Sequence, residues 1–171
     1  MNQEKQSTVL SELQGSEGSI LNDQVLSRHV SHIDHLGIAV SSLSEAIKTY
    51  EVLLGGAVDH LEDVEDQRVK TAFFKVGESA FELLEATDEQ SPIARFLKKN
   101  PRGGIHHVCV GVDDIEAVLR EYKEAGIKLI DQEPRRGAHN KWVAFIHPIA
   151  TGGVLLELSQ SGPLKSESTN D

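Results

Sequence analysis

The chain contains an internal repeat, which constrains the fold more than any other feature of the sequence. The segment IDHLGIAVSSLSEAIKTYEVLLG aligns without a gap on IHHVCVGVDDIEAVLREYKEAGI, at a shift equal to the separation of His35 from His107. Apolar positions match along the alignment, and Tyr50 falls on Tyr122. Because self-similarity at a fixed shift indicates a duplicated structural unit, we expect two copies of one module.

Each copy has the pattern of a strand, an amphipathic helix and three further strands. Apolar residues recur at helical spacing after each opening strand. They are Leu43, Ala46, Ile47, Tyr50 and Leu53 in the first copy, and Ile115, Val118, Leu119, Tyr122 and Ala125 in the second. We expect Ser42 and Asp113 to cap the helices, which should end at Gly55 and Gly126. Strand-like runs follow at about 57–63, 69–76 and 79–86, and at about 127–132, 142–147 and 153–159. The predicted fold class is therefore α+β, with two βαβββ modules.

The expected folded region is about 32–160. Module one should occupy about 32–87, a connecting helix about 91–100, and module two about 104–160. Residues 1–31 are polar and should form a disordered tail, or an arm that packs on a partner subunit, and residues 161–171 should form a second tail. A chain of 171 residues that is 39% hydrophobic can bury one core of useful size.

Charge and composition exclude several classes of partner. A formal net charge of −10 argues against nucleic acid and anionic membranes. No apolar run approaches the roughly 18 residues that a membrane span requires. The single cysteine, Cys109, excludes an internal disulfide framework and fits a reducing compartment, so we expect a cytoplasmic location.

Alternation along the two opening strands predicts where their histidines point. In the first strand, Leu36 and Ile38 share the face that should pack under the helix, and His35 lies on the opposite face beside Gly37 and Ala39. In the second strand, His107 lies opposite the valines, beside Cys109 and Gly111. Both histidines therefore occupy faces with small neighbours, which leave room for a ligand.

The last strand of each copy places a glutamate in the corresponding way. Glu82 alternates with Phe81 and Leu83, and Glu157 alternates with Leu156 and Leu158. A single strand histidine is usually structural, and a single strand glutamate usually faces water. Here the two residue types recur at matching places in both copies, and buried carboxylates need a charge partner. Two imidazoles and two carboxylates are a typical donor set for one divalent cation, so the predicted metal ligands are His35, Glu82, His107 and Glu157.

The remaining histidines and the cysteine are weaker candidates. His106 directly precedes His107 and should point to the opposite face, so we interpret it as structural, like Asp34 at the matching place in the first copy. We expect His147 to form a hydrogen bond. His139 lies in a loop that could border a pocket, and its role stays open. Cys109 shares the face of His107, but we interpret it as a small strand residue.

Several phrases closely resemble the methylmalonyl-CoA epimerase family of the vicinal-oxygen-chelate (glyoxalase/dioxygenase) superfamily. They are IDHLGIAV, ELLEATDEQSPIARFLKKN, GGIHHVCVGVDDI, GAHNKWVAFIHP and GGVLLELSQ. The resemblance covers about 32–160. It implies paired modules whose sheets curve round a metal-lined cleft, a homodimer, an acyl-CoA substrate, and a divalent ion bound by His35, His107 and Glu157, with Glu82 where the family has Gln or Glu.

The implied reaction interconverts the C2 epimers of methylmalonyl-CoA through an enolate. Such a reaction needs a base on each side of a planar intermediate, and the candidate catalytic residues are Glu157 and Glu82. Some family members use a further glutamate on the middle strand of module one. The matching stretch here, QRVKTAFF, has Thr71 and no carboxylate, so Glu82 is the substitute candidate for the second base.

The sequence leaves open alternative activities, the identity of the ion and the residues that contact CoA. Glyoxalase I-type lactoylglutathione lyase uses a similar ligand set, and ring-cleaving dioxygenases and non-catalytic ligand-binding proteins share the superfamily. Cobalt is the expected ion, with manganese, nickel or zinc as alternatives. The two concentrations of basic residues are candidates for CoA phosphate contacts or solvated surface, namely Lys98, Lys99 and Arg102, and Arg135, Arg136 and Lys141.

Overall fold

One curled, mixed sheet of eight strands forms the described part of the protein. The structure is a computed structural model that describes residues 30–166. Most of the two expected tails, residues 1–29 and 167–171, lies outside the described residues. The strand order is β2-β3-β4-β1-β5-β8-β7-β6. The strands are β1 (Val30–Ala39), β2 (His60–Val64), β3 (Val69–Val76), β4 (Ser79–Ala86), β5 (Gly104–Val112), β6 (Arg135–Arg136), β7 (Trp142–Ile146) and β8 (Leu156–Gln160). The helices are α3 (Leu43–Leu54), α4 (Pro92–Lys99) and α5 (Ile115–Glu124).

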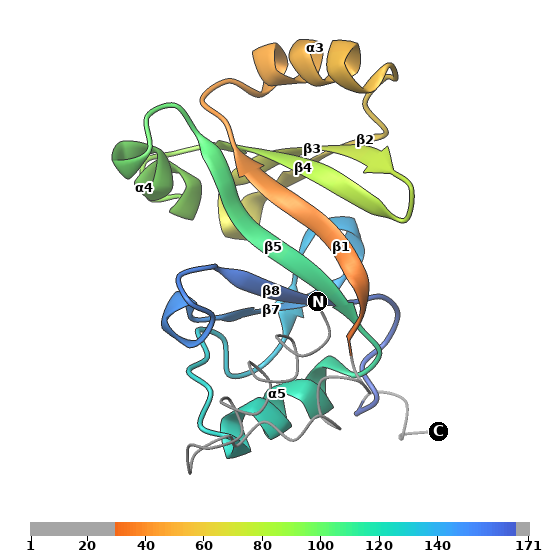
Figure 1. Cartoon of the computed structure of the whole chain (residues 1–171), viewed down its shortest axis with the longest axis vertical. Helices are drawn as coiled ribbons and strands as arrows, with labels where there is room; N and C mark the ends of the chain where they lie inside the picture. The colour runs from red at the N-terminus through yellow and green to blue at the C-terminus, as the bar shows by residue number, and fades with distance from the viewer. Residues whose placement is uncertain (1–29, 167–171) are drawn as a thin grey trace, which may run out of the picture.

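The two modules meet through their opening strands. β1 and β5 pair antiparallel, and each pairs in parallel on its other side with the last strand of its own module, β4 or β8. Figure 1 shows β1 and β5 running side by side through the centre, with α3 and α5 at opposite ends of the molecule. This arrangement confirms the α+β class and the duplicated module. It places the first and last strands of both modules, which carry the predicted ligands, next to one another.

Two separate apolar cores lie beneath α3 and α5. Under α5, the buried residues Ile115, Val118 and Leu119 pack against Ile146 of β7 and Leu158 of β8. Full burial of an aliphatic side chain contributes about 1.5–3 kcal/mol, so this face holds the helix on the sheet.

The core under α3 is less complete. Leu43 is buried against Ala72, Phe74 and Leu83, whereas Leu53, expected on the buried face, is 70% exposed. Only Leu43 of α3 is buried, so the last turn of this helix does not lie on the sheet.

Several predicted boundaries differ from the structure. The side chain of Asp114, one residue after the expected Asp113, caps α5 by accepting a hydrogen bond from the Ala117 amide at 3.0 Å. No strand forms at 127–132, where Leu129 makes only an isolated bridge, because the edge strand β6 pairs with β7 further along the chain. The folded region is also longer than 32–160, since β1 starts at Val30 and the buried Leu164 packs into the α5 core.

The connecting helix α4 forms where it is expected. The Ser91 side chain accepts a hydrogen bond from the Ile93 amide at 3.2 Å, and Pro92 occupies the first turn, where its missing N–H costs nothing. Ile93 is buried against Ala39, Val69 and Leu84, on the side of the sheet that carries the predicted ligands. Among residues 30–166, none of the helices combines the length and apolar character needed to cross a lipid bilayer.

Candidate metal centre

Strand register brings the four predicted ligands to one place. Across the β1–β5 pairing, Gly37 lies opposite His107, and His35 lies opposite Cys109. Across the two parallel pairings, Glu82 lies beside Gly37, and Glu157 lies beside Cys109. Each glutamate is therefore adjacent to the residue two positions after its own module's histidine, and the sequence repeat becomes an approximate twofold arrangement.

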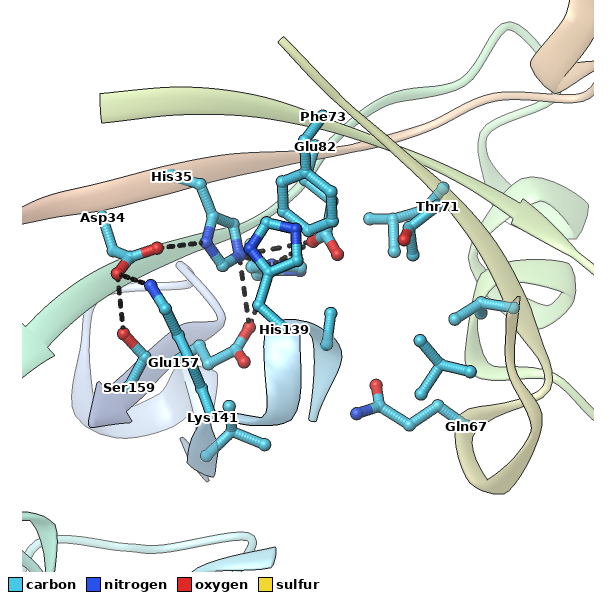
Figure 2. Close-up of a pocket in the computed structure, with 16 residues that line it drawn as sticks. Asp34, His35, Gln67, Thr71, Phe73, Glu82, His139, Lys141, Glu157 and Ser159 are labelled. Atoms are coloured by element: carbon cyan, nitrogen blue, oxygen red, sulfur yellow. Dashed lines mark hydrogen bonds and ion pairs between the residues drawn. The ribbon is translucent and has the colours of Figure 1, made fainter. Parts of the chain in front are cut away.

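The donor atoms of the four side chains converge. The Nε2 atoms of His35 and His107 are 3.1 Å apart. Oε2 of Glu82 lies 3.3 Å from Nε2 of His35 and 3.4 Å from Nε2 of His107. Oε2 of Glu157 lies 3.7 Å and 3.0 Å from the same two atoms. All four residues are between 3 and 7% exposed. Figure 2 shows His35, Glu82 and Glu157 turned toward one another. The predicted ligands are thus gathered in one buried cluster.

The residue before each histidine holds the outer nitrogen of its ring. Nδ1 of His35 is 2.9 Å from Oδ1 of Asp34, and Nδ1 of His107 is 3.0 Å from Nδ1 of His106. Both contacts depend on irregularities in the β1–β5 register, where Asp34 and His106 are the extra residues of two β-bulges. A bulge breaks the alternation of side chains, which lets the extra residue turn beside its neighbour. Both inner Nε2 atoms are thereby directed at the glutamates.

The Asp34 carboxylate is itself fixed by two further groups. The Lys141 ammonium forms an ion pair with Oδ2, and Ser159 donates a hydrogen bond to the same oxygen at 3.0 Å. Burial raises the pKa of Asp34, but its contacts with His35 and Lys141 outweigh burial and hold that pKa far below its usual value. A charged carboxylate behind a ligating imidazole is a common second layer of metal sites.

The pKa values of the residues in the cluster depend strongly on one another's charges. Burial disfavours the charged form of Glu157, but the nearby His107 outweighs it and lowers the pKa of Glu157 to about 2. Burial likewise works against the imidazolium of His107, but Glu157 raises the pKa of His107 to about 9. The pKa of His106 falls to about 4 because of burial and the charge of His107. Two buried carboxylates therefore require nearby positive charge, which protons or a cation can provide.

This donor set fits a divalent metal ion. Donors at the usual 2.0–2.2 Å from one ion lie roughly 3.0–3.4 Å apart when they are adjacent, close to the observed separations. His35, His107 and Glu157 each offer a donor atom within 4.8 Å of the others, all buried. Two carboxylates would neutralise the ion, and the imidazoles favour a transition metal or zinc over magnesium or calcium.

Two cavities adjoin the cluster. The first is lined by Asp34, His35, Glu82, His107 and Glu157 together with Thr71, Phe73 and the loop around His139, and its free volume is only about 30 Å³. The second, of about 270 Å³, shares His107, Val69, Leu84 and Gln67 with the first and extends between α4 and β7. The small cavity can hold an ion and the small polar groups of a substrate bound to it, and the larger one can hold a longer part of the substrate.

The other sequence candidates have separate roles. Cys109 is fully buried, and burial raises the pKa of its thiol to about 11, so it stays protonated beside His35. His147 accepts a hydrogen bond from the Ile149 amide at 3.1 Å, as the sequence predicts. His106, expected to point away from His107, instead contacts the His107 ring, and His139 borders the small cavity.

Of the two groups of basic residues, the one formed by Arg135, Arg136 and Lys141 does not form a single surface patch. Lys141 points into the small cavity and pairs with Asp34, whereas Arg136 stacks on Trp142, with its guanidinium carbon 3.7 Å from the ring centroid. Arg135 lines the larger cavity and lies over Phe145. Lys98, Lys99 and Arg102 are exposed at and beyond the end of α4.

Thr71 is a site residue whose role sequence reasoning did not find. Its hydroxyl is buried on the wall of the small cavity and has no hydrogen-bond partner. A buried polar atom without a partner costs about 1–3 kcal/mol, so its presence in a cavity wall is a sign of a polar occupant. The only signal in the sequence was the missing carboxylate in QRVKTAFF.

Comparisons with known proteins agree with this geometry. The profile of the Glyoxalase/Bleomycin resistance protein/Dioxygenase superfamily matches residues 34–145. An ethylmalonyl-CoA/methylmalonyl-CoA epimerase of Cereibacter sphaeroides is 42% identical over 132 residues, covering 77% of this chain and 98% of the relative. The crystal structure of methylmalonyl-CoA epimerase from Mycobacterium tuberculosis superposes with a TM-score of 0.76 at 36% identity, covering 84% of this chain and 95% of the other. A methylmalonyl-CoA epimerase in complex with methylmalonyl-CoA and NH4+ superposes with a TM-score of 0.75 at 35% identity, covering 79% and 97%.

Proposed function

The chain belongs to the methylmalonyl-CoA epimerase family of the glyoxalase/bleomycin resistance/dioxygenase superfamily, and from this premise we propose that it interconverts the two C2 epimers of methylmalonyl-CoA. The observation that carries the proposal is the convergence of His35, Glu82, His107 and Glu157 in a buried cluster beside a cavity of about 270 Å³. Two glutamates approach this cluster from different modules, as a reaction on both faces of one carbon requires.

The chain's own acid–base groups are Glu157 and Glu82. Epimerisation removes the C2 proton, which lies between a thioester and a carboxylate, and returns a proton on the opposite face through a planar enolate. Each glutamate turns Oε2 toward the imidazoles, which leaves Oε1 to exchange a proton with the substrate. We assign one glutamate to each face of C2. Glu157 belongs to module two and Glu82 to module one. The two carboxylates can therefore act from opposite sides of C2.

A divalent ion held by His35, Glu82, His107 and Glu157 would supply a Lewis acid that stabilises negative charge on the substrate oxygens, an effect of several kcal/mol. Asp34 and His106 keep the ligating rings in place by accepting hydrogen bonds from Nδ1 of His35 and His107. The low pKa of His106 keeps its own ring neutral and able to accept that bond. We propose cobalt as the ion, with manganese, nickel and zinc as alternatives.

Thr71 completes the polar wall of the small cavity. It stands on the middle strand of module one, where some family members use a glutamate. A threonine hydroxyl cannot act as a base near neutral pH, so we assign proton transfer to Glu82 and Glu157 alone. The unpaired Thr71 hydroxyl would instead donate a hydrogen bond to a carboxylate or thioester oxygen of the substrate.

The larger cavity is our candidate for the acyl-CoA arm. Apolar side chains line it, among them Ile130, Phe145 and Leu155. Arg95 and Arg135 contribute positive charge, part of which Asp131 offsets by pairing with Arg135 at 3.6 Å. These two arginines replace the exposed Lys98, Lys99 and Arg102 as our preferred contacts for CoA phosphates. His107 borders both cavities, so a substrate in the larger cavity reaches the cluster at this residue.

Deuterium exchange tests the function directly. Purified protein is incubated with methylmalonyl-CoA in deuterated water, with and without a chelator, and label at C2 is followed by mass spectrometry. The proposal requires rapid exchange that the chelator abolishes and the divalent ion restores. Turnover of methylglyoxal with glutathione, with no exchange at C2, would assign the site to a glyoxalase I-type lyase instead.

We also propose a homodimer in the cytoplasm. The dimer rests on the family resemblance and on exposed apolar side chains in the described region, such as Ile33 at 52% and Ile105 at 60%. Light scattering on purified protein, which would give a single-chain mass if the proposal is wrong, tests the assembly.

A further inference from the structure

A second group of metal-binding side chains lies at the edge of the small cavity. His60 and Glu62 are on β2 of module one, and His139 is in the 3-10 turn Ala138–Asn140 of module two. Each offers one donor atom, and the three atoms lie within 4.8 Å of one another. Nε2 of His60 is 3.2 Å from Oε2 of Glu62. The group shares no residue with the four ligands of the metal centre.

Local structure holds the three side chains together. His60 and Glu62 are two positions apart on one strand, so their side chains point to the same side. The backbone amide of His139 donates a hydrogen bond to Oε2 of Glu62 at 2.9 Å, across the gap between the modules. The His139 ring packs against those of His60 and Phe73, with centroids 4.4 and 4.1 Å apart respectively.

His139 adopts an uncommon backbone conformation that its surroundings must hold in place. Its φ of 55° lies in the left-handed region, which costs a residue other than glycine roughly 1–3 kcal/mol. Asn140, also at φ 55°, extends this strained turn. The turn is held by the Arg136 side chain, which donates hydrogen bonds to Asn140, and by the contacts of His139 with His60 and Glu62 of β2.

We propose that His60, Glu62 and His139 form a second cation site, separate from the metal centre, which binds a borderline divalent ion such as Zn²⁺. Two imidazoles and one carboxylate with an open fourth position are a common zinc donor set. Donors around one tetrahedral zinc ion lie about 3.3–3.6 Å apart, so side-chain rotations that move the donor atoms by about 1 Å would close the group on an ion. The partial exposure of His60 and Glu62 leaves the site open to solvent.

Occupancy of this site would restrict the cleft. His139 lines the small cavity beside Phe73, whose ring also contacts His35 (Figure 2). An ion bound to β2 and to the 138–140 turn would tie module one to module two across that cavity. Bound zinc should therefore slow the entry of substrate, a consequence that rests on the proposed epimerase function, whereas the binding itself does not.

Metal counting tests the site. Full-length protein with cobalt already bound at the centre is dialysed against increasing Zn²⁺ alone, and both metals are measured by elemental analysis. We expect a second equivalent of metal per chain in the wild type. His60→Asn and Glu62→Gln should each weaken the binding of this equivalent by at least about 10-fold, because each removes a direct ligand. The matched control is His147→Asn, since His147 caps a distant turn and should leave the second equivalent unchanged.

A second measurement tests whether the bound ion links the two modules. Amide hydrogen exchange of residues 137–141 should slow when zinc is added to the wild type and stay unchanged in His60→Asn. Zinc should also slow epimerisation in the wild type but not in His60→Asn. Binding of only one equivalent by the wild type, or a second equivalent that survives both substitutions, would overturn the site. Slowed amide exchange in a protein without epimerase activity would support the site and refute the proposed function.

Discussion

Substituting Gly37 by alanine should displace His107 and weaken metal binding. A Cβ atom built on Gly37 would lie 2.1 Å from Cε1 and 2.4 Å from Nε2 of the His107 ring, whereas an ordinary contact needs at least 3.4 Å. The ring would have to retreat by about 1.3 Å, the difference between 3.4 and 2.1 Å. Metal–ligand distances tolerate only about 0.2 Å, so Gly37→Ala should lower metal affinity by at least about 100-fold.

Calorimetric metal titration and C2 exchange measure this effect, with Gly56→Ala as the matched control because nothing lies within 4 Å of a Cβ built there. Overpacking should also reduce the free energy of unfolding by about 1–3 kcal/mol. Most of that loss should vanish when Gly37→Ala is introduced into a His107→Ala background, since the clashing ring is gone. Wild-type metal affinity in folded Gly37→Ala, or an equal loss of stability in both backgrounds, would refute the reasoning.

Four further substitutions probe the centre, its wall and one of its outer contacts. Glu157→Gln and Glu82→Gln should each lower kcat for epimerisation by about 10²–10⁴-fold, and a rate within threefold of wild type for either would remove that residue as a base. Thr71→Val should raise the free energy of unfolding by about 1 kcal/mol in denaturant titrations, because it deletes an unpaired hydroxyl, while lowering kcat/KM. The pKa of His106 is about 4 in the folded protein, below the ordinary 6.5. As the pH drops, His106 therefore takes up a proton in the unfolded chain before it does so in the folded protein. The free energy of unfolding should fall between pH 6.5 and 4 for this reason. Roughly 3 kcal/mol of that loss should disappear in His106→Asn, and an unchanged pH profile of the melting temperature would contradict the assignment.

The convergence of the four proposed ligands could be predicted from the sequence because it follows from two simple periodicities. The repeat pairs His35 with His107, and alternation along each strand places them on the face opposite the helix. Register then brings Glu82 beside Gly37 and Glu157 beside Cys109. None of these steps depends on details of side-chain packing.

The outer contacts could not be predicted because they depend on exceptions to alternation. Asp34 and His106 should point away from the histidines they precede, and the two β-bulges turn them back. The sequence contains no local signal for those bulges, since they arise where β1 and β5 pair. The exposed end of α3 has a related cause, because helical spacing identifies an apolar stripe but not how far the sheet extends beneath it.

The position of the Lys141 side chain could not be predicted from the local composition of the sequence. Its neighbours Arg135 and Arg136 suggest one basic patch in the sequence, but β7 begins at Trp142, and the chain entering it directs Lys141 toward Asp34. Long-range pairing between the modules decides this contact, which joins residues 107 positions apart.

Anomalous diffraction at the cobalt edge, from crystals of the protein with cobalt bound, tests the central claim most directly. The account predicts one strong peak per chain, bonded to Nε2 of His35, Nε2 of His107 and an oxygen of each of Glu82 and Glu157. A cobalt peak elsewhere, with these four side chains still paired only with one another, would contradict it.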